Sequence, residues 1–376
     1  MIKKLYEPKK PYSHEFKINP NLINREIIIK GSKIRGCKFI GNIGYNDIFD
    51  IYYPINYKNK VFLMIKSQDF NLNIDIIDLD NYEIINQLGG GHKINKNISM
   101  IRHFAHLERK KDFLLSSTYN EVVLWDLNLY NIIFIIKSQF SQLSYSSILL
   151  FNDYNKLSPD LIIISYSEKR DIKKDFIKIY NFSSGEFIKN LPDLNSITCF
   201  YLLSWNKFEN NDYKNTYIIA CCISHIIIYD IYNSNNQKII YGKLAYEENG
   251  WINYYNACLV EKREKNNNKN LSNLLYVTSD IGKIFIWDLN SKNLINIIVI
   301  KYDLYGIIDY NEKYLITSNS CEILFVIDIN QNKIISKFKT KEIFGIRCLK
   351  KFIHPKYEES LLTCGNNDRI ILWRTK

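Results

Sequence analysis

The amino-acid sequence predicts an all-β protein built as a ring of repeated four-stranded units, that is, a seven-bladed β-propeller. Three observations lead to this fold class. An aliphatic segment that ends in an apolar or aromatic residue, usually followed by Asp, recurs seven times along the chain. The copies lie 40 to 58 residues apart, and a four-stranded propeller blade needs about 40 to 45 residues. No segment shows sustained helical periodicity, so the short apolar segments are expected to be strands.

The recurring segment is expected to be the third strand of each unit. Its seven copies end near residues 78, 126, 181, 230, 288, 328 and 374. The longer intervals contain polar insertions, such as residues 168–174 and 261–270. A chain of 376 residues also exceeds the roughly 250 to 300 residues at which a single hydrophobic core stops growing, which favours a repeat array.

Two units show all four expected strands. In the second unit, strand-length apolar segments span residues 99–104, 113–118, 121–126 and 131–137. In the sixth unit they span residues 305–310, 313–318, 322–328 and 333–338. These segments are rich in Ile, Phe, Leu or Val, are separated by turn residues and are too short for helices. Each unit is therefore expected to be a four-stranded antiparallel meander.

The ends of these third strands resemble the WD40 repeat family. The Trp-Asp pair occurs at Trp125-Asp126 and again at Trp287-Asp288, and a Gly-His pair precedes the first of them at Gly91-His92. The similarity covers residues 34–376. It is divergent, because other copies replace the Trp or the Asp: Ile77, Tyr180, Tyr229 and Ile327 stand at the Trp position, and Asn181 and Arg374 at the Asp position.

The resemblance also implies a structural lock within the blade. In the WD40 family a His, a Ser or Thr of the second strand, an Asp of the following turn and the Trp form a hydrogen-bonded chain. By this resemblance His92, Ser117 and Trp125 are three of the four members, and Tyr119 stands at the Asp position. One net hydrogen bond contributes about 0.5 to 1.5 kcal/mol and burial of one Ile or Phe about 1.5 to 3 kcal/mol, so aliphatic packing is expected to carry the fold.

The last repeat stops just after its third strand, so its sheet needs a strand from elsewhere. The resemblance implies that an N-terminal strand pairs with this C-terminal blade and closes the ring. Residues 34–40 are the preferred segment and residues 25–30 the alternative. Residues 1–24 are then expected to form a basic arm outside a propeller of residues 25–376.

The positive charge of the chain is concentrated near its N-terminus. The formal net charge is +11, and residues 1–38 hold ten Lys or Arg against three Glu. The repeat body is nearly balanced, so the basic pI does not by itself indicate a nucleic-acid-binding propeller. Two interpretations of the arm stay open: a tether to an acidic partner, RNA or an anionic membrane, and a solvated tail or strap.

No motif for catalysis or for a cofactor stands out. The six His and eight Cys show no CxxC pair or other metal-ligand spacing, and Gly89-Gly90-Gly91 lacks the context of a phosphate-binding loop. We therefore expect no enzyme activity, no metal and no cofactor. The cysteines are expected to be buried free thiols, as in a reducing compartment. No apolar leader or spanning segment is seen, so an intracellular protein, cytoplasmic or nuclear, is expected.

Loops that lead into the units carry aromatic residues, which often anchor protein interfaces. The expected partner-binding face consists of Tyr45, Tyr145, Tyr246, Trp251, Tyr302, Tyr305 and Phe344. The alternative is that some of these rings pack beneath the loops, since the chain holds 28 Tyr and 20 Phe.

The sequence thus favours a non-catalytic scaffold that binds other proteins or peptides within a larger assembly. Binding of anionic lipid or nucleic acid through the basic arm is the alternative, and a propeller hydrolase comes third.

Overall fold

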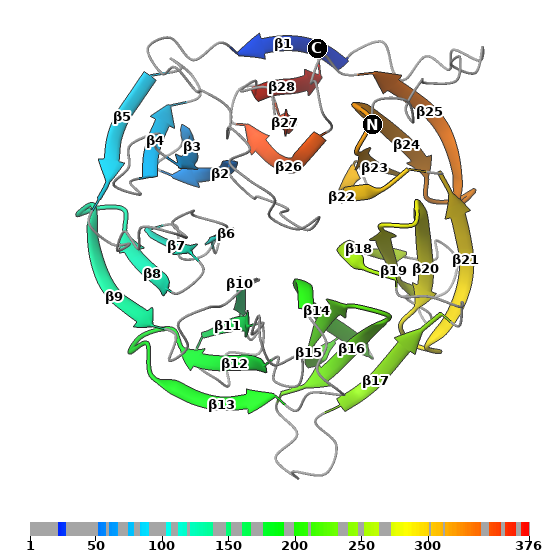
Figure 1. Ribbon diagram of the computed structural model, residues 1–376, viewed down its shortest axis with the longest axis horizontal. Helices are drawn as coiled ribbons and strands as arrows, with labels where there is room; N and C mark the ends of the chain where they lie inside the picture. Colours follow the sequence, from blue (N-terminus) through cyan, green and yellow to red (C-terminus); the bar gives the residue numbers. More distant parts are fainter. Residues whose placement is uncertain are drawn as a thin grey trace, which may run out of the picture.

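The computed structural model of the chain is all-β. It describes residues 22–27, 52–57, 60–66, 74–78, 83–89, 103–106, 112–118, 121–137, 148–151, 160–166, 176–191, 199–209, 212–231, 240–246, 252–262, 272–300, 302–310, 313–339, 346–354, 358–365 and 370–375. Within these residues the strands form seven antiparallel four-stranded sheets. The sheets are arranged around a common centre, with the first strand of each nearest to it and the fourth at the rim (Figure 1).

Each sheet is named here by its place along the chain. The first sheet contains β2 (Tyr52–Tyr57), β3 (Lys60–Lys66), β4 (Ile74–Asp78) and β5 (Glu83–Leu88). The second contains β6 (His103–His106), β7 (Phe113–Ser117), β8 (Glu121–Asp126) and β9 (Asn131–Lys137). The third contains β10 (Ile148–Phe151), β11 (Leu161–Tyr166), β12 (Phe176–Asn181) and β13 (Phe187–Leu191).

The remaining sheets follow the same order. The fourth contains β14 (Cys199–Glu209), β15 (Asp212–Cys222), β16 (His225–Asp230) and β17 (Ile240–Ala245). The fifth contains β18 (Tyr254–Lys262), β19 (Ser272–Ser279), β20 (Lys283–Asp288) and β21 (Asn293–Val299). The sixth contains β22 (Leu304–Tyr310), β23 (Tyr314–Asn319), β24 (Ile323–Asp328) and β25 (Lys333–Lys339). The seventh contains β26 (Ile346–His354), β27 (Glu358–Gly365), β28 (Ile370–Thr375) and β1 (Leu22–Ile27).

The seventh sheet combines the two ends of the chain. Its order is β1-β28-β27-β26, and β1 runs antiparallel to β28 from the pair Leu22↔Thr375 to the pair Ile27↔Ile370. The N-terminal strand therefore overlaps the alternative segment 25–30 and begins within the segment expected to be the arm. The preferred segment, residues 34–40, lies outside the described residues.

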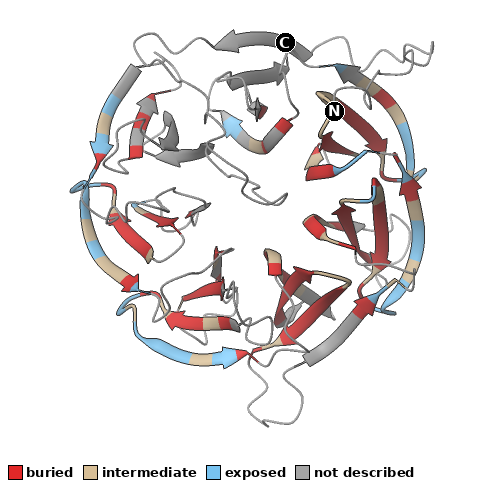
Figure 2. Cartoon of the chain, in the orientation of Figure 1, coloured by how far each residue is buried: buried red, intermediate tan, exposed pale blue. Residues whose placement is uncertain are grey.

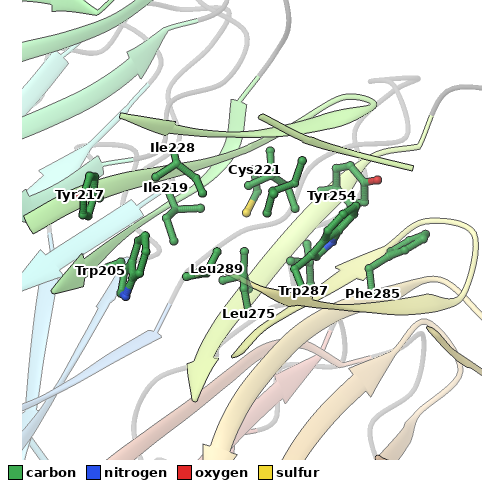
Figure 3. Packing of buried hydrophobic residues seen from close by; sticks show 14 of the residues in the cluster. Trp205, Tyr217, Ile219, Cys221, Ile228, Tyr254, Leu275, Phe285, Trp287 and Leu289 are labelled. Carbon is green, nitrogen blue, oxygen red and sulfur yellow. The ribbon is translucent and has the colours of Figure 1, made fainter. Parts of the chain in front are cut away.

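The hydrophobic core is divided into clusters that lie between neighbouring sheets. Third strands such as β8 and β20 are buried on both faces, since four successive residues of each are covered. Between the fourth and fifth sheets, Trp205 and Tyr217 stack at one end of a cluster, and Trp287 and Phe285 lie towards its other end, near Tyr254 (Figure 3). At the rim, the fourth strands β9, β13 and β21 carry many exposed residues (Figure 2). Packing of one sheet against the next thus holds the structure together.

The recurring Asp caps the turn between the third and fourth strands. Asp126 Oδ1 accepts hydrogen bonds from the backbone N–H of Asn128 at 2.7 Å and of Leu129 at 3.1 Å. Asn181 makes the same contacts to Ser183 and Ser184, because an amide oxygen accepts as a carboxylate does. Asp328 Oδ1 likewise accepts from the backbone N–H of Asn330 and of Gln331, and Asp288 Oδ1 accepts from that of Asn290. The repeat at this position is therefore a turn signal.

The residue four places after each cap adopts a left-handed conformation. It is Tyr130 (φ 53°), Gly185 (φ 72°), Lys292 (φ 61°) or Asn332 (φ 50°). At Gly185 an added Cβ would lie 2.8 Å from Phe134 of β9, so this turn approaches the preceding sheet too closely for a side chain. Glycine is the residue that permits both the conformation and the approach.

Every fourth strand of the first six sheets carries a bulge opposite the end of the third strand. The extra residue is Ile85 in β5, Ile133 in β9, Ile188 in β13 and Ile295 in β21, and each of these four is exposed. A bulge disrupts the ladder of an edge strand and bends it, which discourages pairing with another chain. The bulges that contain these exposed isoleucines therefore protect the edge strands at the rim from pairing with another chain.

Candidate functional site

In the second sheet the tryptophan of the predicted lock makes one hydrogen bond to a serine, but not to the expected one. Trp125 Nε1 donates a hydrogen bond to Ser116 Oγ at 2.7 Å, and both side chains are fully buried. The serine bonded to the tryptophan is thus one residue before the expected Ser117, which is also buried. The register explains this, because Leu114 pairs with Trp125 and Ser116 lies two residues further along β7, on the same face. His92 lies outside the described residues.

The edge of the sheets at which first strands begin carries a distinctive irregularity. We call this edge, which also holds the turns between second and third strands, the leading edge. In the fourth to seventh sheets the second residue of the first strand is an extra, bulged residue: Phe200 in β14, Tyr255 in β18, Tyr305 in β22 and Arg347 in β26. Bulges re-aim side chains and are common beside functional sites. Four successive sheets thus carry a bulge at the same level of the first strand.

Three of these bulged residues form a continuous row of rings across three sheets. The ring of Phe200 meets that of Tyr255 edge-on with centroids 5.4 Å apart. Tyr255 in turn stacks on Tyr305, with centroids 5.8 Å apart and planes at 28°. Tyr255 and Tyr305 are 6% and 7% exposed, whereas Phe200 is half-buried. The row therefore forms a packed aromatic base at the leading edge.

Two carboxylates influence the titration of Tyr255 in this aromatic row. Burial raises the pKa of the Tyr255 hydroxyl, and the negative charges of Asp280 and Asp303, together with Tyr305, raise it further. Asp280 lies in the turn after β19, and its Oδ1 and Oδ2 accept from Asn253 N at 3.0 Å and from Asn253 Nδ2 at 2.6 Å. Burial also raises the pKa of Asp280, and the charge of Asp303 adds a smaller increase. The hydrogen bonds from Asn253 lower this pKa in part. Both carboxylates thus influence Tyr255 at the leading edge.

The three described members of the predicted aromatic face have different environments. Tyr302 precedes β22 and is 36% exposed, next to the exposed Asp303. Tyr305 is buried within the aromatic row. Tyr246 lies against Phe285 with ring centroids 5.1 Å apart, and Lys283 Nζ sits 5.4 Å from its centroid. Of these three, Tyr302 is the exposed ring. Tyr305 is stacked on Tyr255, and Tyr246 links the fourth sheet to the fifth by its contact with Phe285.

Four members of the predicted face, Tyr45, Tyr145, Trp251 and Phe344, lie outside the described residues. Sequence reasoning missed Phe200, Tyr255 and the two carboxylates. Tyr255 stands in a run of apolar strand residues that alternation alone assigns to the core, and only the pairing register reveals the bulge. The sequence did offer one further signal, because an aromatic residue is the second residue of the first strand in three successive repeats.

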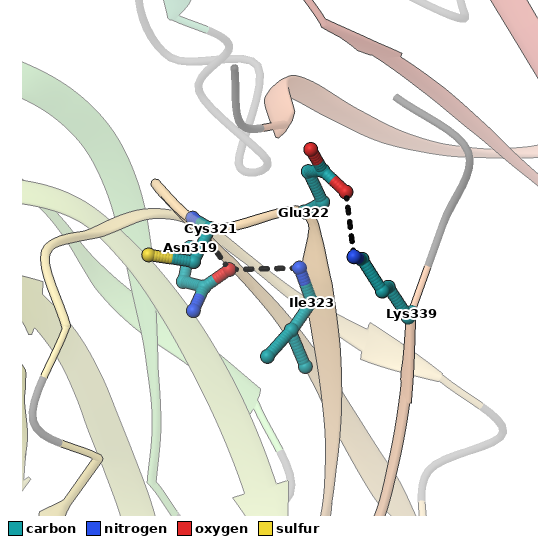
Figure 4. A network of polar contacts seen from close by, with 5 residues as sticks. All are labelled: Asn319, Cys321, Glu322, Ile323 and Lys339. Atoms are coloured by element: carbon teal, nitrogen blue, oxygen red, sulfur yellow. Dashed lines mark hydrogen bonds and ion pairs between the residues drawn. The ribbon is translucent and has the colours of Figure 1, made fainter. Parts of the chain in front are cut away.

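The turn between β23 and β24 extends the leading edge beside this site (Figure 4). Asn319 Oδ1 accepts from the backbone N–H of Cys321 at 3.0 Å and of Ile323 at 2.8 Å. Glu322 Oε2 lies 3.5 Å from Lys339 Nζ, although the lysine is largely exposed and the pair contributes little to stability. Backbone hydrogen bonding, including Ser320 N to Asp303 O at 3.0 Å, therefore fixes this turn beside Asp303.

A second polar cluster lies along the first strands below the leading edge. Lys351 Nζ of β26 is 3.2 Å from Asp309 Oδ2 of β22, in a half-buried ion pair. Burial raises the pKa of Cys258 in β18 to about 12, with a further contribution from Asp309. A thiol with this pKa is protonated at neutral pH and is a poor nucleophile.

Among the residues that the structure describes, no three His, Cys, Asp or Glu side chains gather so as to hold a metal ion. The described part of the chain also contains no helix with the length and hydrophobicity to span a membrane. The cysteines whose side chains are described, Cys199, Cys221, Cys222, Cys258 and Cys321, are free thiols.

Comparisons with known proteins support the fold. No family model matches the chain, and no curated protein matches its sequence. Among solved structures, the chain is similar to Raptor of Chaetomium thermophilum, with a TM-score of 0.60 and 12% sequence identity. The match covers 85% of this chain and 27% of the Raptor chain, so the chain spans about a quarter of that structure. The likeness and the antiparallel four-stranded sheets together give the chain a β-propeller-like fold.

Proposed function

We propose that the chain is a non-catalytic interaction scaffold, a closed seven-bladed propeller of the WD40 type that binds other proteins at its leading edge within a larger assembly. One observation carries this proposal: the exposed Tyr302 and Asp303 directly precede β22, whose Tyr305 is stacked on the buried Tyr255 of the neighbouring sheet. Rigid support of exposed anchor residues lowers the entropic cost of binding a partner.

The blade count and closure of the ring are part of the proposal. Support comes from the seven sheets and from their first strands, which contact one another in the cyclic order β2, β6, β10, β14, β18, β22, β26 and back to β2. The pairing of β1 with β28 joins the chain ends within one sheet. The WD40 assignment is supported by the two Trp-Asp pairs and by the bond from Trp125 to Ser116.

Two matched truncations test the closure. Removal of residues 1–27 deletes β1 and leaves the edge of β28 unpaired, so we expect a large fall in the melting temperature. Removal of residues 1–21 keeps β1 and should leave the melting temperature nearly unchanged. A protein that lacks β1 but melts like the intact chain would show that this strand does not close the ring.

Purification of the tagged full-length protein under gentle conditions tests the scaffold function. We expect protein partners in stoichiometric amounts, and we expect Tyr302→Ala to reduce the recovery of at least one of them. Leu129→Ala is the matched control, because Leu129 is 69% exposed in a turn at the opposite edge. Recovery of the chain alone would refute the scaffold function.

The basic arm supports a second candidate function, binding of an anionic lipid or nucleic acid. Five lysines within the first 17 residues favour it, and such binding would weaken steeply with salt. The truncation of residues 1–21 tests this as well, since binding that survives it does not depend on the arm.

Free thiols at Cys199, Cys221 and Cys222 support action inside the cell, in cytoplasm or nucleus.

A further inference from the structure

Two cysteines face each other at the open end of the β14–β15 hairpin. Cys199 is the first residue of β14 and Cys222 is the last residue of β15, and the pairing register places them directly opposite each other. Opposed residues of an antiparallel pair lie on one face of the sheet, with Cα atoms about 4.5 or 5.5 Å apart. A disulfide joins cysteines whose Cα atoms are about 4.4 to 6.8 Å apart. The backbone therefore holds this pair at a separation that a disulfide bond spans.

Both side chains belong to the same hydrophobic cluster, which the third and fourth sheets form between them. Cys199 is 6% exposed and Cys222 is 2% exposed, and both carry thiols in this structure. The hydrogen bonds that these thiols donate are long: Cys199 Sγ donates to Tyr201 O at 3.5 Å. Cys222 Sγ donates to Ala220 O at 3.7 Å. A thiol is a weak donor, so loss of these two bonds on oxidation costs little.

The adjacent Cys221 is placed differently. It lies on the other face of β15, in the cluster between the fourth and fifth sheets, and it is fully buried. Burial raises the pKa of the Cys221 thiol well above its usual range, and Cys199 raises it further. Cys221 therefore stays protonated and is a poor nucleophile. Of the two neighbouring cysteines of β15, Cys222 is the one presented to Cys199 on a shared face.

We propose that Cys199 and Cys222 are a redox-sensitive pair that closes to a disulfide when the protein meets a peroxide. The pair lies where both strands end, and local opening at strand ends costs less free energy than opening at strand centres. Hydrogen peroxide is small enough to reach Cys199, the more exposed of the two thiols, through such an opening. In reducing compartments disulfides are usually transient and serve redox sensing, which fits a pair that is reduced at rest.

Two steps account for all atoms and electrons. The Cys199 thiolate attacks one oxygen of hydrogen peroxide, the O–O bond breaks, and the departing hydroxide takes up the thiol proton as water. Cys199 is then a sulfenic acid. The Cys222 sulfur attacks the sulfenic sulfur, so the S–S bond forms, the S–O bond breaks, and hydroxide leaves as water with the Cys222 proton. The two thiols lose two electrons and two protons, and one peroxide becomes two waters.

The position of the pair links this chemistry to the leading edge. The disulfide would tie together the free ends of a hairpin whose strands are each 11 residues long. Phe200, the bulged residue next to Cys199, is the first ring of the aromatic row and meets Tyr255 at 5.4 Å between centroids. Oxidation of Cys199 therefore restrains the backbone from which this row begins.

Peptide mapping of the full-length protein tests the proposal. The purified chain is treated with hydrogen peroxide, the remaining thiols are blocked with N-ethylmaleimide in denaturant, and the chain is digested with trypsin. Cleavage after Lys and Arg places Cys199 in the peptide 190–207 and Cys222 in the peptide 215–238. We expect mass spectrometry to show the two peptides joined and lighter by two hydrogen atoms than their sum. Dithiothreitol should separate them again.

Matched variants identify the partner, because the second peptide also contains Cys221. Cys221→Ala should keep the joined peptides, whereas Cys199→Ala and Cys222→Ala should each abolish them. Melting temperatures of the reduced variants check that each is folded. Fragmentation of the joined peptides from the parent chain locates the bond without any variant, so the proposal is tested even where a variant fails to fold.

Each outcome decides the proposal. Joined peptides in the parent and in Cys221→Ala, with the bond located at Cys222, support it. Recovery of both cysteines in blocked form after peroxide, conversion of either to a sulfinic acid without joined peptides, or a bond located at Cys221 overturns it. The measurement uses the purified chain alone, so its result is independent of the scaffold function, which recovery of partners tests separately.

Discussion

The second and fifth sheets end their third strands with the same Trp-Asp pair, yet the two tryptophans differ in their hydrogen bonding. Trp125 Nε1 donates to Ser116, whereas Trp287 Nε1 is buried without an acceptor among the described residues. Leu114 pairs with Trp125 and Leu275 with Trp287, so the position of Ser116 is occupied by Val277 in the fifth sheet. The fifth sheet is as regular as the second. Packing of the indole, rather than its hydrogen bond, therefore determines the fold at this position.

The largest expected effect tests this conclusion directly. Trp125→Ala and Trp287→Ala each remove a large side chain that is at least 96% buried between two sheets. We expect each to lower the free energy of unfolding by about 3 to 5 kcal/mol, because the cavity cannot collapse fully. Equilibrium denaturation measures both. A loss at Trp287 of less than a third of the loss at Trp125 would mean that the hydrogen bond, and not packing, is the main contribution.

A smaller effect isolates the bond itself. Ser116→Ala leaves the Trp125 N–H buried without an acceptor, so we expect a loss of about 1 to 3 kcal/mol in unfolding free energy. In a Trp125→Phe background the donor is gone and the same serine substitution should cost clearly less. The four proteins form a double-mutant cycle. Equal costs in both backgrounds would show that Ser116 stabilises the sheet independently of Trp125.

The fifth sheet allows the opposite change. Val277→Thr keeps the branched shape and places a hydroxyl at the position that Ser116 occupies in the second sheet; in the sixth sheet the equivalent residue is already Thr317. We expect a gain of up to about 1 kcal/mol if the hydroxyl pairs with Trp287 Nε1. In a Trp287→Phe background the hydroxyl finds no donor there and the substitution should destabilise. The same sign in both backgrounds would contradict the proposed pairing.

The comparison also shows what the sequence could predict. The third strands were predictable because burial between two sheets demands a continuous apolar run, and because the turn cap demands Asp or Asn at a fixed place. The third strands of the second and sixth units match the expectation closely, at Glu121–Asp126 and Ile323–Asp328. The first strand of the second unit does not, since it spans His103–His106 instead of the expected residues 99–104. The exact serine of the lock was not predictable, since Ser116 and Ser117 are adjacent and both fully buried. Only the pairing register distinguishes them.

The candidate site was predictable in part for the same reason. Tyr302 and Tyr305 were expected from their position before or at the start of a first strand. Whether a ring is exposed or stacked depends on neighbouring sheets, and Tyr305 proved to be buried against Tyr255. Asp280 was not expected because it lies in a turn of the fifth sheet and acts on Tyr255 of a different strand. Contacts between separate strands leave little trace in local sequence patterns.

The smallest expected effect concerns the turn that the second and fifth sheets share. Asp288 Oδ1 accepts from Asn290 N at 2.8 Å, as Asp126 does from Asn128. Asp288→Asn keeps an acceptor oxygen at this place and should change the unfolding free energy by less than about 0.5 kcal/mol, whereas Asp288→Ala should cost about 0.5 to 1.5 kcal/mol. Thermal denaturation of the pair distinguishes capping from charge. If asparagine proves as costly as alanine, the carboxylate charge is what this position requires, and Asn181 in the third sheet must be compensated by other contacts, such as the bond from Gly185 N to its backbone oxygen at 2.9 Å.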